Sequence, residues 1–275
     1  MSFLAIKIIL VFINSLSSLS ATITNPLIIL AILKTPTLHT PSNVLLCSLA
    51  LSDFGVGLLV QPMFIIKLAS HFLPFNALKF SILLFSGASL LTITAIAVDR
   101  YLALKLHLRY QTVVTVKGTI LVAVCIWCLA TVALLFYSYA DLLAQDIALI
   151  VTPVLCLSIS SYCYIQIYRI VRRHRRQIRD QSRSITRQFS SSCVPTIGQG
   201  KSITTMYYIH GLFVLCVMPS PVSMLIHLVH GIDLGLVIYI FFSWTILFVN
   251  SALNPYLYCW KIPEIRLAVK SLIKF

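Results

Sequence analysis

The sequence predicts an all-α membrane protein, a seven-transmembrane helix bundle with a short C-terminal amphipathic helix. Composition, the length of the apolar runs and the placement of positive charge support this fold class. Of 275 residues, 59% are hydrophobic and 10% are charged, and the mean hydropathy is +0.96. Soluble domains carry about 25% charged residues. A soluble protein of this length would need more polar residues to cover its surface.

Apolar stretches near the ~20 residues that cross a bilayer recur along the chain. They lack the two-residue alternation of barrel strands, so we predict helices, whose backbone hydrogen bonds are satisfied internally. The seven predicted spans are Ile8–Leu33, Asn43–Ala69, Asn76–Leu104, Gly118–Tyr139, Ile147–Ile170, Ile203–Val229 and Leu234–Tyr258. Signal-peptide cleavage after Ala21 would leave the first span too short to cross, so we expect no cleavage.

Most connections between the predicted spans are short. Thr35–Ser42 and Lys105–Lys117 form the first two inner loops, and Ala140–Asp146 forms an outer loop. The sequence therefore divides into residues 1–258, a seven-transmembrane domain that contains a basic third inner loop at 171–200, and residues 259–275, an amphipathic helix on the inner membrane surface with the C-terminus.

The third inner loop is rich in arginine. Its first half, Arg172 to Arg187, is expected to extend the fifth helix, or to remain a solvated loop without a specific partner. Its second half, Ser190 to Gly200, contains Pro195 and Gly198 and is expected to be flexible.

The net charge of +14 is a topology signal, and we expect no nucleic-acid partner. Eighteen of the 21 lysines and arginines fall on one side of the seven-span arrangement; Lys7, Lys67 and Lys79 fall on the other. Positive residues stay cytoplasmic, which places the N-terminus outside and the C-terminus inside. The basic side would also attract anionic membrane lipids.

Polar residues inside the spans form one predicted cluster around Asp53. A carboxylate deep in a span costs about 2.5–3.5 kcal/mol, so it should face polar partners. Oxygen and amide groups suit a small hard cation, and we predict a sodium site; the alternative is a plain interhelical hydrogen-bond network. The residues of this cluster are Asp53, Ser89, Asn250, Ser251 and Asn254, with Asn25 from the first span.

A charged triplet, Asp99-Arg100-Tyr101, ends the third span. An ionisable residue on a spanning helix is a functional-site hypothesis by default. Pro219 in the sixth span and Pro255 in the seventh each remove a backbone hydrogen bond and kink the helix. Such kinks are expected to be moving parts, although static kinks give the same pattern.

The order of these features resembles that of the rhodopsin-like (class A) G-protein-coupled receptors over nearly the whole chain. The motifs that carry the resemblance are Asn25, Asp53, Asp99-Arg100-Tyr101, Trp127, Tyr164, Phe213 with Pro219, and Asn254-Pro255 with Tyr258. The short outer loop and the Leu108–Tyr110 region look most like the melanocortin, lipid, cannabinoid and adenosine receptors.

The resemblance implies a plasma-membrane receptor that is not an enzyme. An extracellular ligand would favour outward movement of the sixth helix, and the exposed inner cavity would activate a heterotrimeric G protein. Arg100, held at rest by Asp99, would then meet Tyr164 and Tyr258. The Asp53 cluster would hold sodium as an allosteric modulator, and no other cofactor is implied. A transporter or channel, or a receptor-derived scaffold that does not signal, remains the alternative.

This chain departs from the family pattern at four positions. Phe75 replaces the usual cysteine at the outer start of the third span, and Val217 replaces the usual tryptophan before Pro219. Cys156 stands where proline is usual, and Gln199 stands where many members have an acid that pairs with the arginine of the triplet. The glutamine at position 199 implies that Arg100 is restrained less strongly in the resting receptor than in most of the family.

The ligand is expected to bind an apolar pocket with a basic rim. Four of its residues lie on one face of the third span by helical spacing. Such a pocket suits a lipid-like anionic ligand or a small peptide; the alternative is that the lysines only snorkel to the interface. The predicted lining is Lys67, Lys79, Ile82, Leu83, Ser86, His227, Trp244 and Phe248.

Overall fold

The computed structural model describes residues 3–70, 74–188 and 210–273, and all the elements within these ranges are helical. The α-helices include α1 (Phe3–Lys34), α2 (Pro41–Gly55), α3 (Gln61–Ala69), α4 (Phe75–Leu106), α5 (Tyr110–Val113), α6 (Val116–Tyr139), α7 (Leu142–Gln188), α9 (Pro219–His230), α10 (Leu234–Lys261) and α11 (Pro263–Ile273). Short turns of other helix types are η1 (Pro36–Leu38), η2 (Val56–Val60) and η3 (His107–Arg109).

Within the described ranges, seven helices are long and apolar enough to cross a membrane, which confirms the predicted fold class. The spans are Phe3–Lys34, Pro41–Ala69, Asn76–Leu106, Val116–Tyr139, Leu142–His174, His210–His230 and Leu234–Lys261. Each overlaps one predicted span. The sixth begins at the first described residue after the gap at 189–209.

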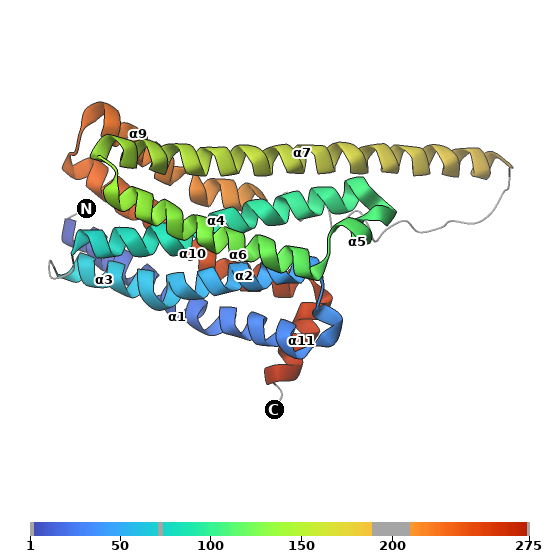
Figure 1. Cartoon of the computed structure of the whole chain (residues 1–275), viewed down its shortest axis with the longest axis horizontal. Helices are drawn as coiled ribbons and strands as arrows, with labels where there is room; N and C mark the ends of the chain where they lie inside the picture. The colour runs from blue at the N-terminus through green and yellow to red at the C-terminus, as the bar shows by residue number, and fades with distance from the viewer. Residues whose placement is uncertain (1–2, 71–73, 189–209, 274–275) are drawn as a thin grey trace.

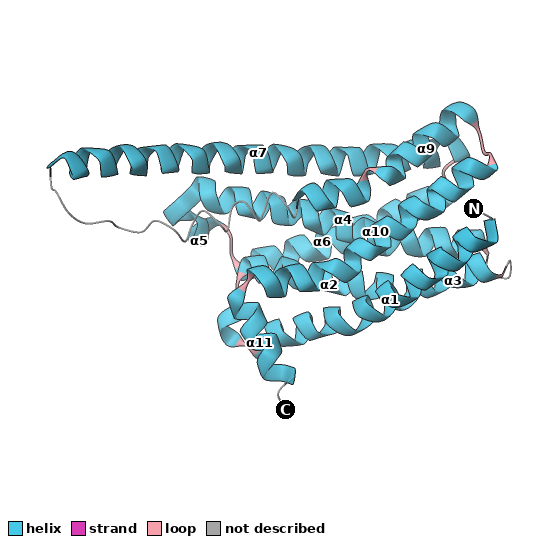
Figure 2. Cartoon of the chain, turned by 180° about the vertical axis from the view of Figure 1, so that it is seen from behind, coloured by secondary structure: helices cyan, strands magenta, loops and turns pink. Residues whose placement is uncertain are grey.

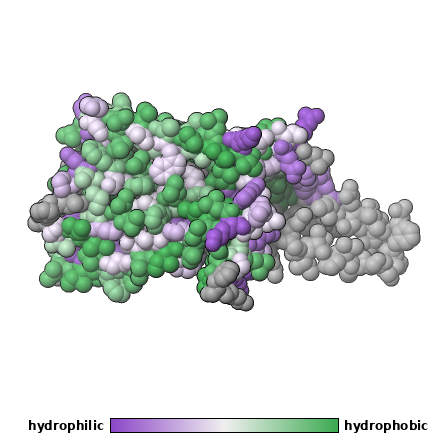
Figure 3. All heavy atoms as spheres, turned by 60° about the horizontal axis from the view of Figure 1, so that its bottom comes forward, coloured by the Kyte–Doolittle hydropathy of each residue, from purple (hydrophilic) through white to green (hydrophobic). Residues whose placement is uncertain are grey.

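The long helices run side by side along one axis of the molecule (Figures 1 and 2). The N-terminus lies at one end of the bundle, here called the N-terminal end, and α11 lies near the other, here called the α11 end. Figure 3 shows a mostly apolar surface over the body of the bundle, with hydrophilic side chains gathered toward the α11 end. An apolar outer surface is what a membrane-embedded bundle presents to lipid.

Side-chain caps start four of the helices. Thr40 accepts a hydrogen bond from the backbone N–H of Asn43, and Thr115 accepts one from Gly118 at 3.1 Å. Asp141 and Asp233 each accept a backbone N–H three residues later, at 2.7 Å. Such caps satisfy backbone donors that a helix cannot pair itself.

The second span is one continuous path made of α2, the π-helical turn η2 and α3. The turn lies just before Pro62, whose ring would clash with a regular helix. Within it, Gly57 approaches the first span so closely that an added Cβ would lie 2.7 Å from the Ala21 Cβ. The Ser18 hydroxyl of the first span donates a hydrogen bond to the backbone carbonyl of Gly57 at 2.7 Å. Glycine is therefore required for this contact between the first two spans.

Three buried apolar clusters hold the bundle together. At the N-terminal end, Phe64 packs edge-to-face against Phe241, Trp244 and Phe248. At the α11 end, a second cluster joins α1, α2 and α11 and includes Ile265, which is fully buried. A third joins α4, α7 and the sixth span through residues including Leu90, Leu157, Phe213 and Val217.

The connection between the fourth and fifth spans is shorter than the predicted Ala140–Asp146. Because Asp141 caps α7, the helix already starts at Leu142, and only Ala140 and Asp141 lie outside the two helices. At its other end α7 runs on to Gln188, so Arg172 to Arg187 extend the fifth helix as predicted. It projects well past the bundle at the α11 end (Figure 1). The predicted flexible segment Ser190 to Gly200 lies outside the described residues.

Candidate functional site

The predicted polar cluster around Asp53 is assembled in the middle of the bundle. The carboxylate is fully buried; Ser89 donates to Oδ1 at 3.1 Å and the Asn254 amide donates to Oδ2 at 2.7 Å. Ser251 is a further hydrogen-bonding partner of the carboxylate. The cluster therefore joins the second, third and seventh spans through one acid.

The neighbouring asparagine, Asn25, donates to the backbone carbonyls of Ala21 and Ser251, at 3.0 and 3.3 Å. Its Oδ1 is buried and, among the described residues, has no hydrogen-bond partner. The buried Ser86 hydroxyl, which lines a small cavity beside this cluster, is in the same situation.

The cavity beside the Asp53 cluster has a volume of about 10 Å³, close to what one water molecule needs. Ser86, Ser89, Asn250 and Ser251 line its polar side. An unpaired hydroxyl and a carboxylate nearby are hard oxygen donors of the kind sodium prefers. The residues present therefore fit a small cation, held by Asp53 with these hydroxyl and amide oxygens.

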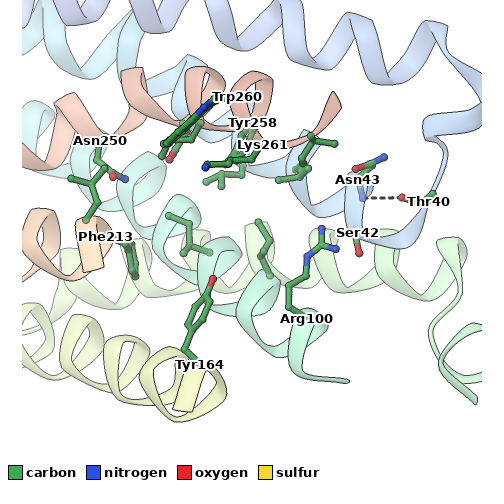
Figure 4. A pocket seen from close by; sticks show the side chains of 18 residues that line it. Thr40, Ser42, Asn43, Arg100, Tyr164, Phe213, Asn250, Tyr258, Trp260 and Lys261 are labelled. Atoms are coloured by element: carbon green, nitrogen blue, oxygen red, sulfur yellow. Dashed lines mark hydrogen bonds between the residues drawn. The ribbon is translucent and has the colours of Figure 1, made fainter. Parts of the chain in front are cut away.

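At the α11 end the bundle opens into a cavity of about 580 Å³. Figure 4 shows Arg100 and Tyr164 pointing into it from α4 and α7, with Tyr258 and Lys261 on the opposite wall from α10. The predicted switch residues Arg100, Tyr164, Phe213, Asn254 and Tyr258 all line this one cavity.

Asp99 and Arg100 separate in the structure, which corrects the expected resting pair. Asp99 is 6% exposed and accepts two short hydrogen bonds, from the Ser42 hydroxyl and the Tyr110 phenol, both 2.6 Å. Among the described residues, which include both Asp99 and Arg100, no ion pair joins these two side chains. Consecutive helix positions point in different directions, so the acid faces the loop while the guanidinium faces the cavity.

Tyr110, in the short helix α5, is the partner that the sequence alone did not reveal. Burial, and then its hydrogen bond to Asp99, raise the pKa of this phenol above its usual value. Both effects keep the hydroxyl protonated, so it remains a donor to the carboxylate.

The remaining predicted switch residues lie away from the cavity. Tyr101 packs edge-to-face on Tyr162 of α7, with ring centroids 6.5 Å apart. Pro219 begins α9, where the sixth span is interrupted at Met218, and Pro255 is buried within α10. Both prolines lie inside spans.

A second pocket, of about 140 Å³, opens at the N-terminal end. Five of the residues predicted to form the ligand site line it: Lys79, Ile82, Leu83, His227 and Trp244. It also contains residues that sequence reasoning missed, above all Asp146, whose Oδ2 lies 3.3 Å from Nδ1 of His227. The rim therefore combines a lysine with a carboxylate and a histidine, and is not simply basic.

Three predicted pocket residues lie elsewhere. Phe248 is fully buried in the apolar cluster around Phe64, because its ring packs edge-to-face there. Ser86 lines the small cavity beside the Asp53 cluster, and Lys67 is placed on α3, outside the pocket lining. Helical spacing gives the face of one helix but not the rotation of its neighbours.

Two of the departures from the expected pattern are buried in the third apolar cluster. Val217 and Cys156 pack with Phe213 in the contact of the sixth span with α4 and α7. Phe75 starts α4. Gln199 lies outside the described residues.

Comparison with known proteins gives consistent similarities. A profile described as 7 transmembrane receptor (rhodopsin family) matches residues 24–145 and 136–258. The chain is 39% identical to the sheep adenosine receptor A3 and 38% identical to the bovine one, each over 103 residues; both matches cover 36% of this chain and about a third (32%) of those receptors' length. It is 25% identical to the human melanocortin receptor 3 over 259 residues, 88% of this chain and 78% of that receptor.

Proposed function

Because this chain belongs to the rhodopsin family of seven-transmembrane receptors, we propose that it is a G-protein-coupled receptor that converts binding of an extracellular ligand into G-protein activation. In this proposal it lies in the plasma membrane, with its N-terminal end outside the cell and its α11 end in the cytoplasm. The placement of most lysines and arginines on the α11 side supports this orientation.

The cavity of about 580 Å³ at the α11 end carries the proposal. It is lined by the cation Arg100 and by two tyrosines, Tyr164 and Tyr258, on three different spans. A site built from three helices changes shape when any one of them moves. Outward movement of the sixth span would widen this cavity, since Phe213 of that span forms part of its wall.

The pocket of about 140 Å³ at the N-terminal end is the proposed ligand site. Its small volume and its largely apolar lining, which includes Ile82, Met224 and Trp244, favour the insertion of one compact apolar group. Such a group could belong to a lipid-like ligand or to a side chain of a small peptide. Lys79 at the rim suits an acidic group, while the Asp146–His227 pair adds a polar contact on the other side.

Sodium is the proposed modulator at the Asp53 cluster. When bound, it would supply a positive charge that compensates the buried carboxylate. Asp53 and Ser89 would hold it, and Asn254 would keep the carboxylate oriented through its 2.7 Å hydrogen bond.

A transporter is the less favoured function, because it needs a polar path through the bundle. Among the described residues, the contact of the sixth span with α4 and α7 consists of apolar side chains, including Leu90, Phe213 and Val217. A receptor-derived scaffold that does not signal would activate no G protein, so measuring nucleotide exchange on G proteins distinguishes it from a receptor.

The test is nucleotide exchange on a panel of purified G proteins by the intact receptor in lipid nanodiscs. The wild type and the Lys117→Ala control, which removes an exposed positive charge at the start of α6, should stimulate at least one G protein. Arg100→Ala should lower that rate at least about tenfold, the effect of losing one or more charge-assisted hydrogen bonds of about 1.5–3 kcal/mol to the G protein. Equal rates in wild type and Arg100→Ala would overturn the proposed coupling site.

A further inference from the structure

A histidine at the start of the described part of the sixth span contacts the fifth span at the α11 end. The imidazole of His210 stacks on the phenol ring of Tyr164, with centroids 4.4 Å apart and an interplanar angle of 23°. Its Nε2 also lies 3.1 Å from the Ser161 hydroxyl. Ser161 and Tyr164 are three residues apart on α7 and therefore share one helix face.

The two contacts fix the imidazole in position and orientation. The stack sets the plane of the ring, and the hydrogen bond to Ser161 sets its rotation within that plane. The other nitrogen, Nδ1, is buried and has no hydrogen-bond partner among the described residues. An unpaired buried nitrogen costs free energy, so the stack and the single hydrogen bond must hold the ring against that cost.

The stacked tyrosine also lines the cavity at the α11 end. Its hydroxyl points into the cavity that Arg100 also enters (Figure 4). Phe213, one turn along the sixth span from His210, lines the same cavity. The sixth span therefore contacts the ring of Tyr164 while the hydroxyl end points into the cavity that Arg100 also lines.

We infer that His210 is a positioning residue that couples the location of the sixth span to the direction of the Tyr164 hydroxyl. When the sixth span keeps its place, the stack holds the phenol in the cavity. When the span moves, the stacked ring moves with it, and without the stack the direction of the phenol no longer follows the sixth span. The effect on signalling rests on the proposed receptor function, whereas the effect on the Tyr164 ring does not.

The first experiment measures the ring alone, in purified full-length receptor in nanodiscs without ligand or G protein. A single fluorotyrosine is introduced at position 164 and its ¹⁹F NMR signal is recorded. His210→Ala should shift and broaden this signal, whereas His210→Phe, which keeps an aromatic ring, should restore it. Fluorotyrosine at position 162, on the exposed side of α7, serves as the control and should be insensitive to both variants.

The second experiment measures basal nucleotide exchange on the responsive G protein. His210→Ala should lower the rate about tenfold, the combined effect of one aromatic stack and one hydrogen bond. His210→Phe should recover most of it, and Ser161→Ala should fall between. In a Tyr164→Ala background, His210→Ala should have no further effect, because the residue through which it acts is gone.

The outcomes separate the two proposals. An unchanged ¹⁹F signal at position 164 in His210→Ala, or equal broadening at position 162, overturns the positioning inference. A changed signal that His210→Phe restores supports it, even if the wild type activates no G protein, a result that would overturn only the proposed function. If exchange falls in His210→Ala by the same factor with and without Tyr164, His210 does not act through the tyrosine and the inference is overturned.

Discussion

We predict that the hydrogen bonds from Ser42 and Tyr110 to Asp99 influence the basal activity of the proposed receptor. Tyr110→Phe removes the 2.6 Å bond from the phenol and leaves the ring in place. The carboxylate then keeps one partner, the Ser42 hydroxyl, and is freer to turn toward the neighbouring guanidinium. Pairing with Asp99 would withdraw Arg100 from the cavity, so we expect Tyr110→Phe to lower basal G-protein activation.

The size of this effect follows from the hydrogen bond that is lost. A hydrogen bond to a charged acceptor contributes about 1.5–3 kcal/mol. Tyr110 is only partly buried, so we take the lower limit of about 1.5 kcal/mol, which is about a tenfold change in an equilibrium constant. Basal activity should therefore fall about tenfold in Tyr110→Phe, and further in the double variant with Ser42→Ala.

The assay is ligand-free nucleotide exchange by purified receptor in nanodiscs at matched receptor concentration. Tyr139→Phe is the matched control, because that tyrosine is 90% exposed at the other end of the bundle. It should leave the basal rate unchanged. Unchanged or higher basal exchange in Tyr110→Phe would show that the Asp99 hydrogen bonds do not restrain pairing with Arg100.

Three further predictions concern stability, ionisation and sodium. Gly57→Ala forces a Cβ against the first span and should lower the free energy of unfolding by about 1–3 kcal/mol, which is several degrees in the Tm of thermal unfolding in detergent. Gly87→Ala is the control and should leave the Tm unchanged, because a Cβ at position 87 would have no neighbour within 4 Å. Equal Tm values in the two variants would contradict the close contact. Burial and the hydrogen bond to Asp99 raise the pKa of Tyr110, so Asp99→Asn should lower that pKa toward 10, while burial keeps it above 10. The stability that protonated Tyr110 contributes below pH 10 should be lost as the pH rises through the raised pKa. Absorbance at 295 nm, measured against matching variants that also carry Tyr110→Phe, follows the titration of this phenol, and an unchanged pKa in Asp99→Asn would argue against the hydrogen bond. Replacing choline chloride by sodium chloride should stabilise the wild type by about 1.4 kcal/mol at ten times the dissociation constant and should not stabilise Asp53→Asn; an equal gain in both would place sodium elsewhere.

The seven spans could be predicted from the sequence because membrane helices are specified by local composition. The Asp53 cluster could also be predicted, since a buried carboxylate must find polar partners and only a few candidates lie at its depth. In the structure its carboxylate accepts hydrogen bonds from Ser89 and Asn254, two of the candidates. Both features depend on rules that act within one helix or on a single costly group.

The contacts between helices could not be predicted in the same way. The His210–Tyr164 stack and the Asp146–His227 pair each join residues of two different spans, and their geometry depends on how each helix is rotated. The sequence predicts Phe248 in the ligand pocket, whereas the rotation of α10 places its ring in the apolar cluster around Phe64. The sequence marks one member of each pair, a histidine in an apolar span or an acid near the start of a helix, but it does not identify the partner of that residue.

The Asp99 contacts depend on the loop after the third span. Tyr110 reaches the carboxylate because η3 and α5 fold the chain back, and the sequence of this loop has no periodic pattern that predicts such a turn. Tight turns of this kind are determined by local backbone geometry, including the positive φ of His107, and not by hydrophobic patterning.

The two-residue connection between α6 and α7 has a consequence for the kinetics of ligand exchange at the proposed ligand site. Tyr137 and Asp146, on either side of it, both line the pocket at the N-terminal end, so Ala140 and Asp141 supply almost no backbone to cover that part of the rim. Where a long loop folds over a site, its opening limits how fast ligand enters and leaves. If ligand binds this pocket as proposed, we expect no loop opening on this side, so that its residence time would depend on the contacts inside the pocket and its association rate on diffusion and orientation.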